Sequence, residues 1–226
     1  AIQTSTDKIN DGYFTVGVRD NLASEFEAAE ASGNTVTITF DEYLNALAVP
    51  DAAVFSVDVG GSARTVTNVA ISGKDVVLTI DGAALTDADT VTVDYTKPAS
   101  GIVLEDTQGN DADSLSDVIV GTSGANTHTG SSADDIITGN VGDDILIGNG
   151  GIDILDYNST ADGNDTINNF TVGAGGDQLD LSDVLDFAAG DSLADYLTVV
   201  DDGTDVTVSV DANGDGSGAD FTITLA

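Results

Sequence analysis

The chain contains no cysteine, methionine or tryptophan, a single histidine and only 5 basic residues among its 226. Without cysteine it can form no disulfide, thiolate metal site or cysteine nucleophile. With one histidine, His128, an H-E-x-x-H zinc motif is excluded, and a Ser-His-Asp triad would depend on that residue alone. The shortage of Lys and Arg disfavours nucleic acid and anionic membrane surfaces as partners. Apolar runs of about 18 residues are missing too, so we expect no membrane insertion.

Acidic residues are numerous and unevenly placed. Asp and Glu number 40, and 35 of them are Asp. Residues 98–226 hold 25 acidic residues and no Lys or Arg, so ion pairs within that half cannot offset the repulsion. Two carboxylates stacked about 4.8 Å apart repel by about 3.5 kcal/mol at an effective dielectric of about 20. Solubility or adaptation to salt would explain the sign of the charge, whereas bound divalent cations would also relieve the repulsion.

Oxygen-bearing side chains recur every nine residues through the middle of the chain. The clearest units are 139–147 (GNVGDDILI) and 148–156 (GNGGIDILD), each with Gly at positions 1 and 4, Asp at position 6 and an aliphatic residue at position 7. The unit 130–138 lacks Gly at position 4, and the unit 121–129 has a neutral Asn at position 6. Solubility does not explain this spacing. The position-6 residues are Asp117, Asn126, Asp135, Asp144, Asp153 and Asp162.

This pattern resembles the nonapeptide repeat G-G-x-G-x-D-x-U-x of the RTX (repeats-in-toxin) family of secreted bacterial proteins. The resemblance implies a parallel β-roll in which two units form a coil of about 18 residues, and coils stack about 4.8 Å apart. Position-6 ligands would then pair across coils, as Asp117 with Asp135, Asn126 with Asp144, Asp135 with Asp153, and Asp144 with Asp162. Position 7 is expected to point inward, and its residues are Val118, Thr127, Ile136, Ile145 and Ile154.

Calcium is the expected ion, because it takes about six to eight oxygen ligands, whereas magnesium demands a strict octahedron and retains its waters. Gly at positions 1 and 4 permits backbone angles that aim carbonyls at an ion. A series of Asp-Gly turns without an ion is the alternative. By the resemblance, turn carbonyls complete the shell, and the candidates are Gly130, Ser132, Gly139, Val141, Gly148 and Gly150. A further ion that closes the roll would use Asp165, Asp177 and Asp180.

Two other features have competing interpretations. Residues 211–216 (DANGDG) match the start of an EF-hand loop, but Thr222 stands where the bidentate Glu is required. A β-hairpin turn is favoured, and a peripheral calcium held by Asp211, Asn213 and Asp215 is the alternative. His128 occupies position 8 of the weakest unit, and we expect it to face outward from the roll.

Residues 1–116 are predicted to form one β-rich unit, because Val, Thr and Ile alternate there with polar residues. Turns predicted at 60–61 and 72–74 favour an antiparallel sandwich. A short helix is expected at 22–31, where Leu22, Phe26 and Ala29 share a face, and a second helical turn at 41–47. The predicted strands are 13–18, 35–40, 54–59, 64–72, 75–80 and 90–95.

The same region resembles a bacterial Ig-like repeat of the kind found in cyanobacterial swimming-motility surface proteins. Such repeats act as spacers in tandem arrays, which implies a structural role without chemistry of its own. Residues 1–33 fit the repeat less well and form either an added strand and helix or a linker. The likeness lies in residues 36–42, 49–59, 66–73, 77–80, 89–98 and 104–112.

Beyond Asp162 the nine-residue frame fades. Residues 162–170 and 176–185 resemble the segment that closes the RTX region in type I secretion target domains. Further strands are predicted at 197–200, 205–210 and 221–225, with a turn at 201–203. We therefore predict an all-β protein, with an Ig-like antiparallel β-sandwich at 1–116 and a short parallel β-roll capped by antiparallel strands at 117–226.

These resemblances imply a calcium-binding module, folding only with calcium, at the C-terminal end of a large bacterial adhesin. Type I secretion machinery would export it, and it would act as a monomeric module of a longer chain, secreted or on the cell surface. Because no carboxylate pair stands out as acid and base, we expect no enzymatic activity. An accessory RTX module of a secreted polysaccharide lyase, epimerase or protease is the alternative. Binding of a glycan through exposed calcium is a third interpretation.

Overall fold

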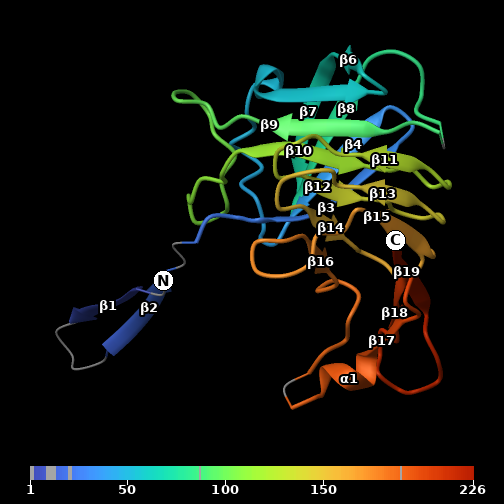
Figure 1. Cartoon of the computed structure of the whole chain (residues 1–226). Coiled ribbons are helices and arrows are strands. Elements are labelled where there is room, and N and C mark those ends of the chain that lie inside the picture. The colour runs from blue at the N-terminus through green and yellow to red at the C-terminus, as the bar shows by residue number, and fades with distance from the viewer. Residues whose placement is uncertain (1–2, 9–13, 20–21, 87, 189) are drawn as a thin grey trace.

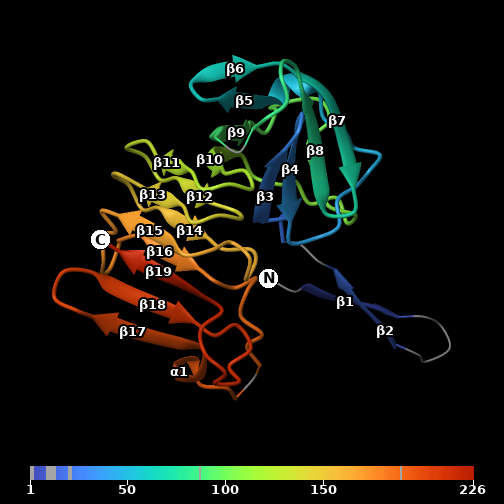
Figure 2. The ribbon, with the colours of Figure 1, turned by 90° about the vertical axis from the view of Figure 1, so that its right-hand side faces the viewer.

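The protein is almost entirely β-structure, with a sandwich of antiparallel strands followed by a parallel solenoid (Figures 1 and 2). The computed structural model describes residues 3–8, 14–19, 22–86, 88–188 and 190–226. The first two strands, β1 (Gln3–Lys8) and β2 (Phe14–Arg19), pair as an antiparallel hairpin. β2 corresponds to the strand predicted at 13–18, whose first residue lies outside the described residues. The predicted fold class is confirmed.

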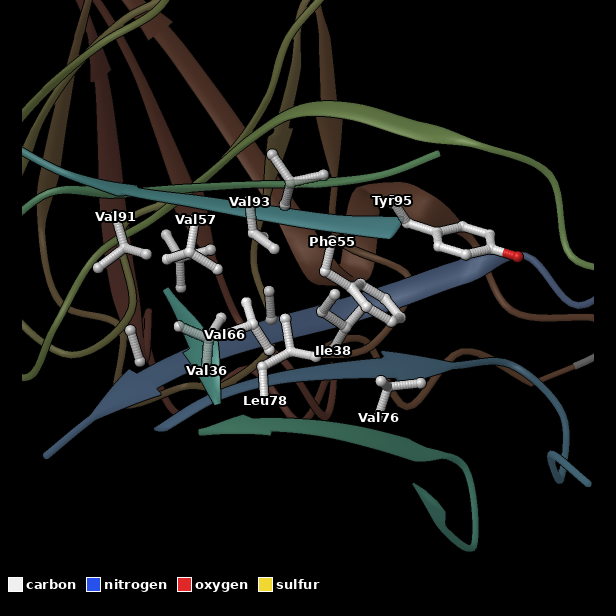
Figure 3. Close-up of a cluster of buried hydrophobic side chains, with 14 of the residues drawn as sticks. Val36, Ile38, Phe55, Val57, Val66, Val76, Leu78, Val91, Val93 and Tyr95 are labelled. Atoms are coloured by element: carbon white, nitrogen blue, oxygen red, sulfur yellow. The ribbon is translucent and has the colours of Figure 1, made fainter. Parts of the chain in front are cut away.

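The sandwich has two sheets that enclose one apolar core. Its strands are β3 (Phe26–Ser32), β4 (Thr35–Phe40), β5 (Phe55–Val59), β6 (Ser62–Arg64), β7 (Val66–Ser72), β8 (Asp75–Ile80) and β9 (Val91–Tyr95), with a short 3-10 helix at Ala52–Val54. One sheet has the order β3-β4-β8-β7, and the other contains β9, β5 and β6. In β4, β5, β8 and β9 alternate residues are apolar and buried, as pleated strands with one covered face require. Figure 3 shows Phe55 and Tyr95 of one sheet in this core with Ile38 and Leu78 of the other.

The helix predicted at 22–31 is wrong, because this segment forms β3 and pairs antiparallel with β4. Within it Ala29 and Ala31 are buried while Glu30 and Ser32 are exposed, a period of two that a helix cannot produce. The Val- and Ile-containing neighbour β4 offers a strand edge, and pairing with it outweighs the helix propensity of the Ala and Glu residues in this segment. The helical turn predicted at 41–47 is also wrong: Leu44 there forms an isolated bridge with Asp106.

One strand joins the sandwich to the solenoid. β10 (Leu115–Val120) pairs antiparallel with β9 on one side and parallel with β12 (Ile136–Thr138) on the other. The resulting sheet runs without interruption in the order β16-β14-β12-β10-β9-β5-β6. Since β10 spans the boundary that we placed between residues 116 and 117, the two parts share a sheet as well as a chain.

The solenoid alternates its short strands between two parallel sheets. The strands are β11 (Thr127–Thr129), β12, β13 (Ile145–Ile147), β14 (Ile154–Asp156), β15 (Asp165–Asn168) and β16 (Gln178–Asp180). Even-numbered strands extend the sheet of β10, and odd-numbered strands form the opposite sheet. Val118 pairs with Ile136, and Ile136 with Ile154, so each coil adds 18 residues at first, as the nine-residue frame predicts.

The inward-pointing residue of each unit is at position 8, and our expectation of position 7 is wrong. Leu146 at position 8 is 0% exposed, whereas Ile145 at position 7 is 40% exposed. The strands β11 to β14 have three residues each, and because side chains alternate along a strand, the central residue points inward. His128 is a position-8 residue and is 0% exposed, so the expected outward orientation is wrong as well. The column of position-8 residues is Ile119, His128, Ile137, Leu146 and Leu155.

This arrangement predicts unequal costs for two neighbouring substitutions. Leu146→Ala should lower the free energy of unfolding of the solenoid by about 2–5 kcal/mol, because it leaves a cavity between buried neighbours. Ile145→Ala, with the same kind of truncation beside it, should cost less than about 1 kcal/mol. Urea unfolding in calcium, followed by circular dichroism, measures both, and equal losses would contradict the assigned orientation.

The C-terminal segment caps the solenoid. It contains a short helix, α1 (Leu193–Tyr196), and three strands, β17 (Leu197–Asp201), β18 (Val206–Val210) and β19 (Phe221–Leu225). β19 runs parallel to β15 and antiparallel to β18, so the sheet changes from parallel to antiparallel at this point. The predicted final strands are confirmed. Among the described residues no helix is long and apolar enough to cross a membrane.

Candidate metal centre

Oxygen-bearing side chains, most of them at position 6, form two columns, one along each sheet of the solenoid. In each column a carboxylate accepts a hydrogen bond from the main-chain amide of the residue one coil earlier. Asp153 Oδ1 accepts from Asp135 N at 3.0 Å, and Asp144 Oδ1 accepts from Asn126 N at 2.6 Å. The first column contains Asp117, Asp135, Asp153 and Asp177, and the second contains Asn126, Asp144 and Asp165.

Each of the central carboxylates keeps one oxygen atom without a partner. Asp135, Asp144, Asp153 and Asp165 are all nearly fully buried. Their unpartnered atoms are Asp135 Oδ1, Asp144 Oδ2, Asp153 Oδ2 and Asp165 Oδ2, each buried and without a hydrogen bond in the described part of the chain. A buried carboxylate oxygen that lacks a partner costs the full desolvation of that group, so these sites require a cation or a proton.

The electrostatics of both columns agree with this requirement. Burial raises the pKa of Asp144 to about 6, and the charges of Asp143 and Asp162 act in the same direction. Burial likewise raises the pKa of Asp165 to about 7. The pKa of Asp135 is raised by burial first and then by the charges of Asp153 and Asp117. Without a cation, these groups therefore hold protons more tightly than an ordinary aspartate.

Glycine is required where the turns meet the carboxylates. A Cβ at Gly148, position 1 of its unit, would lie 2.0 Å from Asp153 Oδ2. Gly151, at position 4, has φ +122, and a Cβ there would lie 2.3 Å from the carbonyl oxygen of Ala133 in the coil before. The Gly-rich turns thus pack directly on the acidic side chains and on each other, as the repeated glycines predict.

The predicted pairs Asp117–Asp135, Asp135–Asp153 and Asn126–Asp144 are neighbours within their columns. The pair Asp144–Asp162 is not, because Asp165 takes the next place and its Oδ1 accepts from Asp144 N at 2.8 Å. Thr127 pairs with Ile145, 18 residues on, but Ile145 pairs with Thr166, 21 residues on, so the frame slips by three residues here. Asp162 instead lies in the turn, where its Oδ2 accepts from Asn158 N at 2.9 Å and from Ser159 N at 3.1 Å.

The three residues predicted to close the roll do not come together. Asp165 belongs to the second column and Asp177 to the first, where Asp177 Oδ1 accepts from Asp153 N at 3.1 Å. Asp180 ends β16, and its Oδ1 accepts hydrogen bonds from the amide and hydroxyl of Ser182. The candidate carbonyl donors Gly130, Ser132, Gly139, Val141, Gly148 and Gly150 lie in or beside the turns between the strands.

Three aspartates of this region were not predicted from the sequence. Asp156, at position 9, is buried and accepts from Thr138 Oγ1 at 3.0 Å and from Asn158 Nδ2 at 3.2 Å, and burial raises its pKa to about 7. Asp134 and Asp143, at position 5, accept hydrogen bonds from main-chain amides of the next coil and so connect successive turns. The available signal for Asp156 was its carboxylate at position 9, where the preceding units have Thr or Ile.

The arrangement can hold a hard cation only with help from the main chain. Among the residues that the structure describes, no three His, Asp or Glu side chains converge as a metal site by themselves. An ion in either column would therefore use carboxylates of successive coils together with turn carbonyls. This all-oxygen donor set fits calcium rather than zinc or copper, which favour nitrogen and sulfur ligands.

The EF-hand-like segment forms the connection between β18 and β19, so the prediction of a hairpin turn is confirmed. Asp211 Oδ2 accepts from Gly216 N at 2.9 Å, and Asn213 Oδ1 accepts from Asp215 N at 3.0 Å. Asp215 Oδ1 accepts in turn from Ser217 N at 2.7 Å. These three side chains therefore support the turn.

Residues 19–100 match the SWM repeat family, described provisionally as a flagellar system-associated repeat. The match spans the strands β3 to β9, that is, the sandwich without its link to the solenoid. The comparison with curated proteins gave no match. A repeat of this family beside a β-solenoid is consistent with a repeat-containing bacterial surface protein.

Proposed function

We propose that the chain is a calcium-dependent folding module of a secreted or surface-attached bacterial adhesin, with an RTX-type β-roll that binds several calcium ions. The observation that carries this proposal is the set of buried, unpartnered carboxylate oxygens on Asp135, Asp144, Asp153 and Asp165. A fold that keeps such groups inside gains most from a ligand that supplies positive charge to each of them.

Calcium would then control where the chain folds. Extracellular modules commonly bind calcium with dissociation constants of about 10⁻⁴–10⁻³ M, so their sites stay empty in the calcium-poor cytosol and fill outside. Each site held at ten times its constant would add about 1.4 kcal/mol to stability. Unfolded in the cytosol, the solenoid would remain threadable through a type I secretion machine, and its folding outside would hold the chain there.

The sandwich supports an adhesin over an accessory module of a secreted enzyme. It is a spacer-type repeat with one apolar core, and β10 continues its sheet into the solenoid. This continuity would pass force from the roll to the spacer along one sheet. Among the residues that the structure describes, no comparable observation favours the enzyme-linked alternative or glycan binding.

Calorimetric titration with calcium tests the proposal on the full chain. Asp135→Asn removes charge from the middle of the first column and should lower both the calcium stoichiometry and the affinity. Asp113→Asn, at a side chain that is 90% exposed beside Lys97, is the matched control and should leave both unchanged. Absence of calcium binding by the unmodified chain at millimolar calcium would refute the proposed function.

A further inference from the structure

The slip of the nine-residue frame coincides with a tyrosine in a glycine position. Position 1 is glycine at 121, 130, 139 and 148, but the next unit begins with Tyr157. At Gly148 a side chain would collide with the carboxylate of the same unit, Asp153, at 2.0 Å. Tyr157 carries its ring at the equivalent place, and in this unit Asp162 sits in the turn while Asp165 enters the column instead.

The ring of Tyr157 turns into the interior and ends the regular coils. The residue is 2% exposed and belongs to the solenoid core. Its ring stacks on that of Phe221 in β19 with centroids 5.6 Å apart and planes at 19°. Tyr157 therefore links the last regular coil to the antiparallel cap.

The hydroxyl of Tyr157 is left among acidic groups. It is buried and makes no hydrogen bond of good geometry among the described residues, but it lies within hydrogen-bonding reach of Asp165, a contact that shifts the pKa of both groups. Asp144 Oδ2 and Asp165 Oδ2 are also buried and lack a partner of good geometry. The charged groups that act on this hydroxyl are Asp165, Asp162 and Asp144. Asp144 and Asp165 are successive members of the second column, joined by the 2.8 Å bond from Asp144 N to Asp165 Oδ1. Three buried oxygen atoms from three segments thus occur in one region, with the Tyr157 hydroxyl beside Asp165.

We propose that the Tyr157 hydroxyl, Asp144 and Asp165 line one cation site that differs from the sites between Gly-rich turns. The inference rests on the proposed function, because it concerns one of the ions in the roll. The phenol would keep its proton, directed at a carboxylate oxygen, and offer a lone pair to the ion. A hard cation such as calcium suits these oxygen donors, and the surrounding core would leave it fewer bound waters than an ion at the first column.

Terbium luminescence tests this inference on the full chain, with Tb³⁺ as the calcium substitute. The chain has 5 tyrosines and no tryptophan, so emission excited through the protein reports a tyrosine beside the ion. Tyr157→Phe retains the ring that stacks on Phe221, and it should abolish most of this emission and weaken binding of one ion, while the other ions of the roll stay bound. Tyr196→Phe, beside the 211–216 turn, is the matched control and should keep the emission.

Two more variants separate the possible outcomes. Asp165→Asn keeps Tyr157 and should lose the emission, whereas Asp153→Asn in the first column should keep it. Should Tyr157→Phe fail to fold, the contrast between Asp165→Asn and Asp153→Asn decides the question. Calcium binding by the roll together with emission that survives Tyr157→Phe or Asp165→Asn would overturn this inference alone. Absence of any bound ion would overturn the proposed function with it.

Discussion

Removal of calcium at neutral pH is expected to unfold the solenoid and its cap while the sandwich stays folded. Emptying a site that was held at ten times its dissociation constant lowers the free energy of unfolding by about 1.4 kcal/mol. A whole domain is stable by only about 5–15 kcal/mol. Removal also leaves buried carboxylates in successive coils without a counter-charge. The sandwich has its own apolar core and contains the Lys74–Glu27 ion pair, so it does not depend on these ions.

Amide hydrogen exchange measures this difference by segment. In chelator, protection should disappear from β12 to β16 and from β18 and β19, and it should persist in β4, β8 and β9. Protection of β10 should be intermediate, because it keeps its antiparallel partner β9 and loses its parallel partner β12. Magnesium at the same concentration is the control and should not restore the solenoid. A solenoid that remains protected in chelator at low salt would contradict the proposal.

The metal-free chain should be more stable at pH 5 than at pH 8. Burial raises the pKa of Asp156 and of Asp165 to about 7, and that of Asp144 to about 6, whereas an unfolded aspartate titrates at about 3.9. The folded state therefore binds these protons more tightly. These bound protons stabilise the folded state fully below about pH 4. Their contribution, a few kcal/mol in total, is lost as the pH rises through about 6 to 7.

Thermal unfolding of dialysed, metal-free protein tests this profile: at pH 8 only the sandwich should show a transition, and at pH 5 a transition of the solenoid should appear as well. Asp156→Asn keeps an oxygen acceptor for Thr138 and removes the buried charge, so it should stabilise the metal-free chain at pH 8 and flatten the pH dependence. Saturating calcium should reverse the trend, since calcium competes with protons for the carboxylates of the two columns. A metal-free chain with equal stability at pH 5 and pH 8 would show that the buried carboxyls do not hold protons.

The stacking of the acidic residues could be anticipated as far as Asp153, because it depends on local repetition. Equal units of nine residues place like turns above each other, and Asp135, Asp144 and Asp153 follow from counting. The place of Asp165 in the second column could not be predicted by counting. That place depends on the three-residue slip after Tyr157, which coincides with the loss of glycine at position 1 and is visible only in the register of the folded coils.

Amino-acid composition and period alone determined that this protein is all-β, that an antiparallel part precedes a parallel one, and that acidic oxygens line the turns. These properties follow from alternation along a strand and from repeat length, which are local. Only the tertiary structure decided that β10 belongs to both parts, that position 8 faces inward, and that His128 lies in the core. These features depend on which strand edges meet and which side chains compete for the same interior space, and both are set by contacts between residues distant in the chain.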